Sequence, residues 1–185
     1  AVRRAGQALI AAQAELDALD AKVGDGDAGS TFAAGARAVI ADLDAGHLAT
    51  GEPPIFFSDL GALLSRVMGG SSGVLLSILF TAMGTSMAHG ATLVDALAFG
   101  LARVQHYGGA RAGDRTMLDA LLPAAAALRE GVATAARAAR EGADATGKMT
   151  RAGAGRSSYV PEAALLGAVD PGAEAVARAF AALAE

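Results

Sequence analysis

Three aspartates that lie close together in the sequence are the residues best suited to chemistry. Asp20, Asp25 and Asp27 fall in the stretch DAKVGDGDAGST at residues 20–31, with glycines interleaved among them. Carboxylates crowded this closely raise each other's pKa unless a cation or shared protons compensate for the repulsion. Hard cations such as Mg²⁺ bind oxygen ligands, usually a few carboxylates together with substrate phosphates. The stretch therefore predicts a magnesium site, and a solvated Asp-Gly turn is the alternative.

Two further glycine-rich loops contain residues suited to binding anions. The segment GGSSG at residues 69–73 precedes an apolar run, so its hydroxyls and backbone N–H groups would stand at a helix N-terminus, which favours phosphate. No lysine follows these glycines, which excludes a Walker A loop. The segment GAGRSSY at 153–159 contains Arg156, and arginine suits bidentate recognition of phosphate. A flexible turn and a solvated arginine are the respective alternatives.

Other polar residues give weaker signals. In the segment GDRTM at 113–117, we expect Asp114 to cap the following helix, while Arg115 either contacts phosphate or is solvated. The three histidines share no spacing that would indicate a metal site. The chain has no cysteine and no GxSxG motif, so we assign no catalytic nucleophile.

Composition indicates one all-helical domain over residues 1–185. Hydrophobic residues make up 53% of the chain and aromatic residues only 4%, which favours closely packed helices. A net charge of −4 with scattered basic residues gives no case for nucleic acid. The longest apolar run, at 74–83, is too short to span a bilayer, and no signal-peptide pattern occurs, so we expect a cytoplasmic protein. The start at Ala1 fits processing or excision from a longer polypeptide.

Hydrophobic periodicity predicts about eight helices and no strand. The apolar positions recur at helical spacing in an opening helix at 1–19 and in later segments at 32–43, 60–68, 74–87, 93–104, 117–128, 132–141, 161–168 and 171–183. We expect 74–87 to be buried on most sides, Pro123 to kink or break its helix, and Asp170 to cap the last helix. The predicted loops are 20–30, 46–57, 69–73, 108–115 and 151–158. Short connections favour an antiparallel up-down bundle closed into a barrel.

In an up-down bundle alternate loops share one end, so the acids and the glycine-rich loops would meet at one rim. That combination suits a Mg-nucleotide better than other common ligands, because the metal and the helix N-termini would both face phosphate.

Five motifs make the chain similar to the nucleotide-binding L domain of dihydroxyacetone kinases over nearly its full length. They are LDAKVGDGDAGST at 19–31, MGGSSG at 68–73, GDRTMLDAL at 113–121, AGAGRSSYV at 152–160 and DPGA at 170–173. The resemblance implies an eight-helix barrel that binds ADP or ATP at one end through Mg²⁺.

The resemblance also implies a role for individual residues. Asp20, Asp25 and Asp27 would ligate a pair of magnesium ions that bridge the phosphates. The nucleotide itself would be bound by Gly29, Ser30, Thr31, Ser71, Ser72, Gly108, Met117, Arg156, Asp170, Pro171 and Gly172. Many members of the family have histidine directly after DGD, where this chain has Ala28.

The family uses this domain in two ways. In one, ATP is the donor and the L domain is fused to, or associated with, a K domain that holds the ketone. In the other, ADP stays bound as a cofactor and a phosphotransferase-system protein rephosphorylates it. The motifs at 113–124 and 152–160 resemble the ATP-dependent type. Since no K domain is present in the chain, we expect a kinase of glycerone or a related ketose that is inactive without a K partner.

Two alternative functions differ from that of a ketose kinase. One is a non-enzymatic nucleotide-sensing module, which would bind Mg-nucleotide without supporting transfer. The other is a fatty-acid kinase-type domain, against which the motifs at 113–121 and 152–160 argue.

Overall fold

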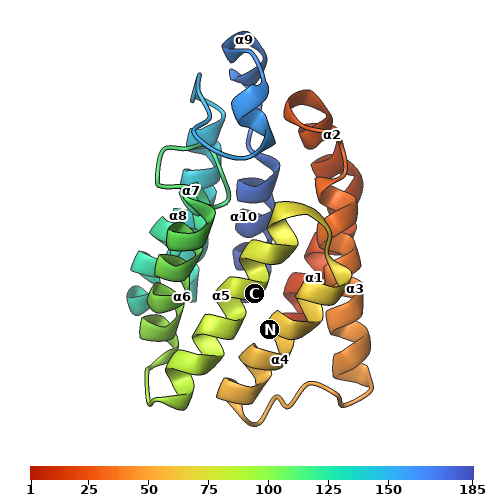
Figure 1. Ribbon diagram of the computed structural model, residues 1–185, viewed down its shortest axis with the longest axis vertical. Helices are drawn as coiled ribbons and strands as arrows, with labels where there is room; N and C mark the ends of the chain where they lie inside the picture. Colours follow the sequence, from red (N-terminus) through yellow and green to blue (C-terminus); the bar gives the residue numbers. More distant parts are fainter. The chain divides into compact units, whose positions relative to one another are not determined.

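The computed structural model describes residues 1–185 and is all-helical, which confirms the predicted fold class. It contains ten α-helices and two short 3₁₀ helices (Figure 1). Their bounds are α1 Val2–Ala11, α2 Gln13–Val23, α3 Ala28–Asp44, α4 Pro53–Val67, α5 Gly70–Ala88, α6 Leu93–Gly108, α7 Leu118–Ala127, η1 Leu128–Glu130, α8 Val132–Thr146, η2 Arg156–Tyr159, α9 Glu162–Leu165 and α10 Pro171–Ala184.

The ten α-helices differ from the predicted segments at two places. The opening segment forms two helices, because the backbone at Ala12 (φ −82°, ψ 0°) leaves helical geometry between α1 and α2. The segment 161–168 forms only the single turn α9. The predicted loop at 46–57 is also too long, since α4 already begins at Pro53, and proline at the first turn of a helix fixes a suitable φ without losing a hydrogen bond.

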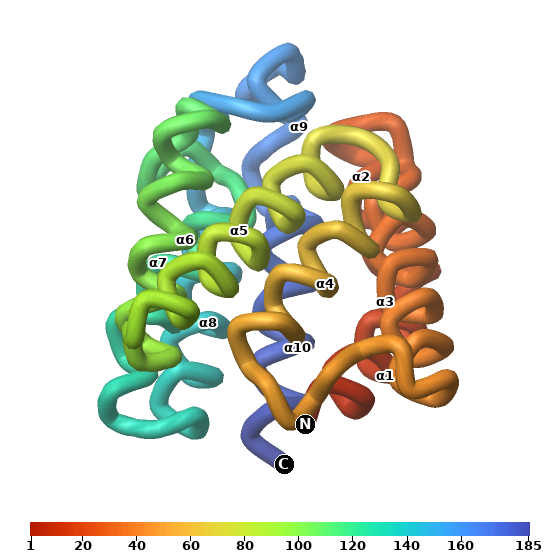
Figure 2. The backbone as a smooth tube through the Cα atoms, turned by 60° about the horizontal axis from the view of Figure 1, so that its bottom comes forward, coloured from red at the N-terminus to blue at the C-terminus, as the bar shows by residue number.

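The chain divides into two compact units, one formed by residues 1–33 and 110–185 and the other by residues 34–109. In the first unit, α10 packs against α1, α7 and α8. Figure 2 shows the two ends of the chain near each other, and Arg4 Nε of α1 donates to the carbonyl of Ala182 in α10 at 3.2 Å. The buried side chains of this unit include Leu16, Leu118 and Leu165.

Helices α7 and α8 approach closely at a proline. Pro123 lies inside α7 without ending it, and the missing N–H leaves the carbonyl of Asp119, four residues earlier, without its helical donor. Gly142 of α8 faces this carbonyl, and a Cβ atom at Gly142 would stand 2.1 Å from the oxygen. The pairing of proline with glycine therefore lets the two helices pack at short distance.

In the second unit, α4, α5 and α6 pack in sequence order (Figure 1). Phe57 of α4 stacks on Phe80 of α5 with ring centroids 6.1 Å apart, and Leu79 and Met83 are buried. The prediction that 74–87 is buried on most sides is wrong, because only Leu79, Met83 and Gly84 within it are buried and Val74 is exposed. Helix α5 is also long and apolar enough to cross a bilayer by length and composition, a weak criterion that core helices of soluble proteins also meet.

Candidate functional site

The three predicted aspartates come together at the turn between α2 and α3. Each offers a carboxylate oxygen, and the three oxygens lie within 4.8 Å of one another. Asp20 stands in the last turn of α2 and is buried, with 8% of its surface exposed, whereas Asp25 and Asp27 are exposed in the connecting loop. Part of the predicted loop at 20–30 is helical, so the acids are held between two helix ends rather than in a long flexible segment.

Asp20 organises the loop around itself. Its Oδ2 atom accepts hydrogen bonds from the backbone N–H groups of Gly26, Asp27 and Ala28, at 2.9, 3.0 and 3.3 Å. The first N–H groups of a helix have no partner within the helix, so a carboxylate placed there stabilises the start of α3. Because one oxygen of Asp20 binds the loop, the carboxylate is fixed in place and its other oxygen is the one suited to a metal ion.

Asp17 is a fourth acid at this turn, and the sequence analysis missed it. Its two oxygens accept from the backbone N–H and from the hydroxyl of Ser30, both at 2.8 Å. Asp17 and Asp20 are three residues apart in α2 and thus share a helix face. This spacing was the feature of the sequence that could have indicated a role for Asp17. A Cβ atom at Gly29 would lie 2.0 Å from the carbonyl oxygen of Gln13, so glycine is needed where α3 meets α2.

The side chain of Ser30 is hydrogen-bonded to two residues of α2. Its hydroxyl lies between Asp17 and the side-chain amide of Gln13, which donates to it at 3.2 Å. The N–H of Thr31 bonds the carbonyl of Asp27 at 2.9 Å. The segment from Gly29 to Thr31 is therefore held by hydrogen bonds to α2 and to the loop that contains the acids.

Arg156 reaches the acid cluster from a distant part of the sequence. It is the first residue of η2, and its Nη1 atom forms an ion pair and hydrogen bond with Oδ2 of Asp25. The side chains of Arg156 and Asp25 are 62% and 40% exposed. The structure thus brings together an arginine predicted to contact phosphate and an aspartate predicted to bind metal.

The chemistry of the acid cluster fits Mg²⁺. The three ligating groups are carboxylates, the hard oxygen donors that magnesium prefers, and the cluster contains no histidine or thiolate ligand. Asp25 and Asp27 are open to solvent, which suits an ion that keeps several ligands for water or phosphate.

Arg115 is a buried positioning residue rather than a phosphate ligand or a solvated cation. The side chain is fully buried, Nη1 donates to the hydroxyl of Ser157 at 3.2 Å, and Nη2 donates to the carbonyl of Ala168 at 2.5 Å. Its φ of 59° is the one positive value at a non-glycine residue of the chain. Arg115 therefore ties the Arg156 loop to the segment before α10, and nothing in the sequence distinguished it from a surface arginine.

Two aspartates shape the turn before α7. Asp119 accepts from the N–H of Gly113 at 2.6 Å through one oxygen and from the N–H of Thr116 at 2.8 Å through the other. Asp114, expected to cap the helix, instead accepts from the N–H of Arg111 at 2.7 Å. Asp119 therefore holds the turn that precedes α7, while the first N–H of the helix, at Leu118, donates to the hydroxyl of Thr116 at 3.2 Å.

The start of α10 contains the predicted DPG residues. Asp170 caps the helix by accepting from the N–H of Ala173 at 2.8 Å, as predicted, and Pro171 occupies the first turn. A Cβ atom at Gly172 would lie 3.2 Å from Cβ of Met117, so these two predicted nucleotide-binding residues are neighbours. Burial raises the pKa of Asp170 to about 6, although the Ala173 N–H and the charge of Arg115 oppose the rise.

The remaining predicted residues belong to the unit formed by residues 34–109. Ser71 and Ser72 lie in the first turn of α5, whose N-cap residue Gly69 supplies no side-chain hydrogen bond. Gly108 is the last residue of α6, and the left-handed Gly109 (φ 75°) ends the helix. His89 and His106 stand at the C-terminal ends of α5 and α6, where a helix dipole favours them.

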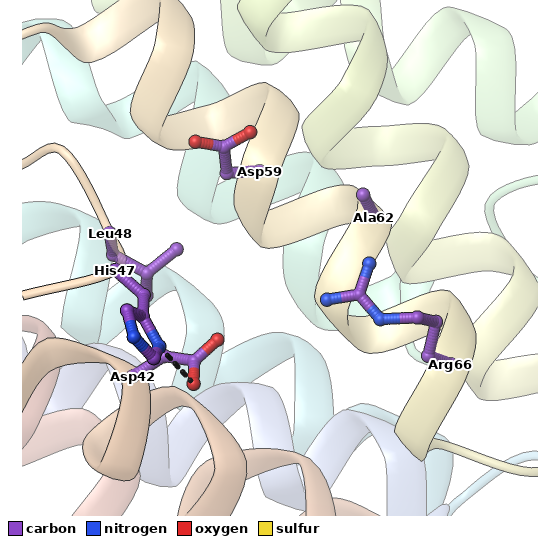
Figure 3. Close-up of a pocket in the computed structure, with 6 residues that line it drawn as sticks. All are labelled: Asp42, His47, Leu48, Asp59, Ala62 and Arg66. Atoms are coloured by element: carbon purple, nitrogen blue, oxygen red, sulfur yellow. Dashed lines mark hydrogen bonds and ion pairs between the residues drawn. The ribbon is translucent and has the colours of Figure 1, made fainter. Parts of the chain in front are cut away.

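This second unit also has a pocket of about 350 Å³ (Figure 3). The pocket is lined by Asp42, His47, Leu48, Asp59, Ala62 and Arg66. His47 Nδ1 lies 3.4 Å from Oδ1 of Asp42, as the dashed line in Figure 3 marks. None of the residues predicted to bind metal or nucleotide lines it.

Comparison with known proteins identifies the family to which the chain belongs. A family model described as the DAK2 domain matches residues 22–185. The chain belongs to the DAK2 domain family. It is 49% identical over 176 residues to a dihydroxyacetone kinase of Citrobacter freundii, a match covering 94% of the chain and 32% of that protein. The resemblance to the L domain of dihydroxyacetone kinases is thereby confirmed.

Solved structures of the family give the same fold. The crystal structure of the dihydroxyacetone kinase from C. freundii in complex with AMP-PNP and Mg²⁺ matches with a TM-score of 0.86 at 44% identity, covering 99% of the chain and 32% of that protein. Another relative is the ADP-binding subunit DhaL of a PEP-dependent dihydroxyacetone kinase of Listeria innocua, 37% identical over 62% of the chain and 55% of that subunit. The chain spans about a third of the length of the C. freundii kinase.

Proposed function

We propose that residues 1–185 act as a single L-type domain that binds a Mg-nucleotide and donates its phosphoryl group to a ketose held by a separate K-type domain or subunit. The observation that carries this proposal is the set of three carboxylate oxygens within 4.8 Å at the α2–α3 turn, in a member of the DAK2 family. The C. freundii relative, whose structure contains AMP-PNP and Mg²⁺, supports ATP or ADP and magnesium as ligands.

In this proposal each element of the first unit has a distinct task. Asp20, Asp25 and Asp27 hold a pair of magnesium ions, which would neutralise charge on the phosphates during transfer. Arg156 binds a phosphate oxygen, while Met117 and the segment Asp170–Gly172 line the nucleotide. No protein nucleophile is needed, because positioning and charge stabilisation account for phosphoryl transfer.

Residues outside the acid cluster are assigned on the strength of the resemblance. Gly29, Ser30 and Thr31 would meet the nucleotide, although the hydroxyl of Ser30 bonds Asp17. Ser71, Ser72 and Gly108 remain predicted nucleotide-binding residues in the second unit. The first turn of α5 supports this for Ser71 and Ser72, since its backbone donors lack a side-chain acceptor.

We place the chain with the ATP-dependent kinases and in the cytoplasm. The match to the C. freundii kinase is longer and closer than the match to the L. innocua subunit, at 94% against 62% of the chain and 49% against 37% identity. A K-type domain would then be the partner that binds the ketose. The alternative is an ADP-retaining subunit served by a phosphotransferase-system protein. Such a subunit should keep ADP through purification, whereas an ATP-dependent domain should exchange it.

Calorimetric titration of ADP and ATP into the metal-stripped chain, with and without Mg²⁺, tests the proposed ligands. We expect Mg-dependent binding that weakens about 100-fold or more in Asp25→Asn, because a ligand to the metal is lost. Asp59→Asn is the matched control, since Asp59 is an exposed aspartate in the pocket of Figure 3. Nucleotide binding that is independent of Mg²⁺, or equally weakened in both variants, would contradict the proposal.

The transfer step requires a second measurement. The chain is mixed with the K-type part of the C. freundii kinase, dihydroxyacetone and Mg-ATP, and the formation of the phosphorylated ketose is followed. We expect product only when both proteins are present. A chain that binds Mg-nucleotide but yields no product with this partner would favour the sensing module.

A further inference from the structure

Arg156 and Asp25 form an ion pair at the site proposed for the metal, so one carboxylate has two competing cations. We propose that Arg156 is a tethered counter-ion of the acid cluster, which the metal ion displaces from Asp25 and which then binds the phosphate of the nucleotide. This inference rests on the proposed function and adds a coupling between metal and nucleotide binding.

The backbone that carries Arg156 is held in place. The next residue, Ser157, is buried, and its hydroxyl accepts from Nη1 of the buried Arg115. The N–H of Val160 bonds the carbonyl of Ser157 at 3.1 Å and closes the 3₁₀ turn. The backbone at Arg156 is therefore fixed. Its guanidinium can change partner by rotation of the side chain alone.

The pair itself is easy to separate. With 62% of Arg156 and 40% of Asp25 exposed, water screens the attraction, and ion pairs of this kind contribute little to stability. A divalent cation at the cluster would interact with three carboxylates at once, whereas the guanidinium bonds only Asp25. Direct ligation of a metal by Asp25 therefore outcompetes the arginine.

Repulsion among the acids explains why a counter-ion is useful without metal. The carboxylate oxygens of Asp20, Asp25 and Asp27 lie within 4.8 Å of one another, and like charges at this distance repel. Arg156 offsets part of this repulsion. Once a metal ion takes over that role, the released guanidinium needs a new anion, and planar guanidinium groups bind phosphate through paired hydrogen bonds.

The exchange predicts effects of opposite sign on two affinities. Without nucleotide, Arg156 competes with the metal and weakens metal binding. With nucleotide present, the same arginine contributes a phosphate contact and strengthens binding of the complex. By thermodynamic linkage, Arg156 thus adds to the mutual enhancement of metal and nucleotide affinity. An arginine with a purely structural role would weaken both affinities or neither.

The test measures Mn²⁺ binding by electron paramagnetic resonance and Mg-ADP binding by calorimetry on the full chain. In Arg156→Gln we expect Mn²⁺ alone to bind about two- to fivefold more tightly, and Mg-ADP to bind about tenfold more weakly. Arg156→Lys keeps a cation without the paired donors, so Mn²⁺ affinity should stay within about twofold of wild type while Mg-ADP still weakens. Arg151→Gln is the control, because Arg151 is 86% exposed and lies 3.8 Å from Glu162.

Unchanged or weaker Mn²⁺ binding in Arg156→Gln would overturn the exchange. So would unchanged Mg-ADP affinity in that variant. A wild-type chain that binds Mn²⁺ but no Mg-ADP would contradict the proposed function instead, and the Mn²⁺ affinities would still decide whether Arg156 competes with metal at Asp25.

Discussion

Helices α3 and α5 both begin in glycine-rich segments with adjacent hydroxyl residues, yet their first turns are satisfied in opposite ways. At α3, Asp20 accepts from the N–H groups of Gly26 and Asp27 just before the helix and of Ala28 at its start, and Asp17 accepts from that of Ser30. At α5, the N-cap Gly69 provides no side-chain acceptor. The α3 start therefore serves as a rigid mount for carboxylates, whereas the α5 start keeps donors that suit an anion.

Similar glycine-rich motifs thus have different structural roles at the starts of α3 and α5. Glycine at position 29 is required by packing, because a side chain there would collide with α2. Gly69 has φ −81°, a value open to any residue, and no atom within 4 Å of where its Cβ would be.

Gly29→Ala should have the largest effect. The added Cβ atom would stand 2.0 Å from the carbonyl of Gln13, so α2 and α3 must move apart at a cost of roughly 3 kcal/mol in unfolding free energy. Gly69→Ala should change that free energy by less than about 0.5 kcal/mol. Urea denaturation of both variants checks the prediction, and equal stabilities would show that the two glycines do not differ as described.

The start of α10 extends the comparison to a buried cap whose effect depends on pH. Burial raises the folded-state pKa of Asp170 to about 6, above its ordinary value of 3.8, so the folded state binds the proton more tightly. The contribution of this group is thus fully present below pH 3.8 and is lost as the pH rises through 6. Between these limits the loss amounts to about 3 kcal/mol, from 1.36 kcal/mol per pKa unit.

Asp170→Asn tests this pH dependence because asparagine can still cap a helix without titrating. The unfolding free energy of wild type relative to the variant should fall between pH 4.5 and pH 7.5. Asp59→Asn, at an exposed position, should leave the wild-type profile unchanged. A parallel pH profile for wild type and Asp170→Asn would show that the buried carboxyl has an ordinary pKa.

Asp20→Ala should have the smallest of the three effects on stability, at about 2 kcal/mol, because three N–H groups at the start of α3 lose their acceptor. Asp20→Asn should cost less, since its amide oxygen can still accept. Ser71→Ala should cost under about 0.5 kcal/mol, because no side chain caps α5. Thermal or urea unfolding compares the three variants. If Ser71→Ala lowered the unfolding free energy as much as Asp20→Ala, the starts of α3 and α5 would not differ as described.

Much of the fold and part of the site could be read from the sequence. Apolar spacing identified the helices that bury Leu60, Leu64 and Leu101, and the pair Asp170-Pro171 marked the start of α10. The division between α1 and α2 could not be predicted, because Ala12 is a good helix former and gives no stop signal.

The site divides in the same way. Asp20, Asp25 and Asp27 were predictable as a cluster, because they lie close together in the sequence. The role of Asp17 depends on how α2 meets α3, and the burial of Arg115 depends on contacts with Ser157 and Ala168, more than 40 residues away. Long-range contacts of this kind leave no local pattern in the sequence.

The most direct test of the central claim is the ³¹P spectrum of ADP bound to the chain as Mn²⁺ is added. If the α2–α3 turn holds the metal against the phosphates, the phosphate resonances should broaden with the wild-type chain beyond what the same Mn²⁺ causes in free ADP, because the bound paramagnetic ion would lie beside them. In the double variant Asp25→Asn with Asp27→Asn, this protein-dependent broadening should disappear. Equal broadening with the double variant would show that metal and phosphate meet elsewhere, and the assignment of the acid cluster would fail.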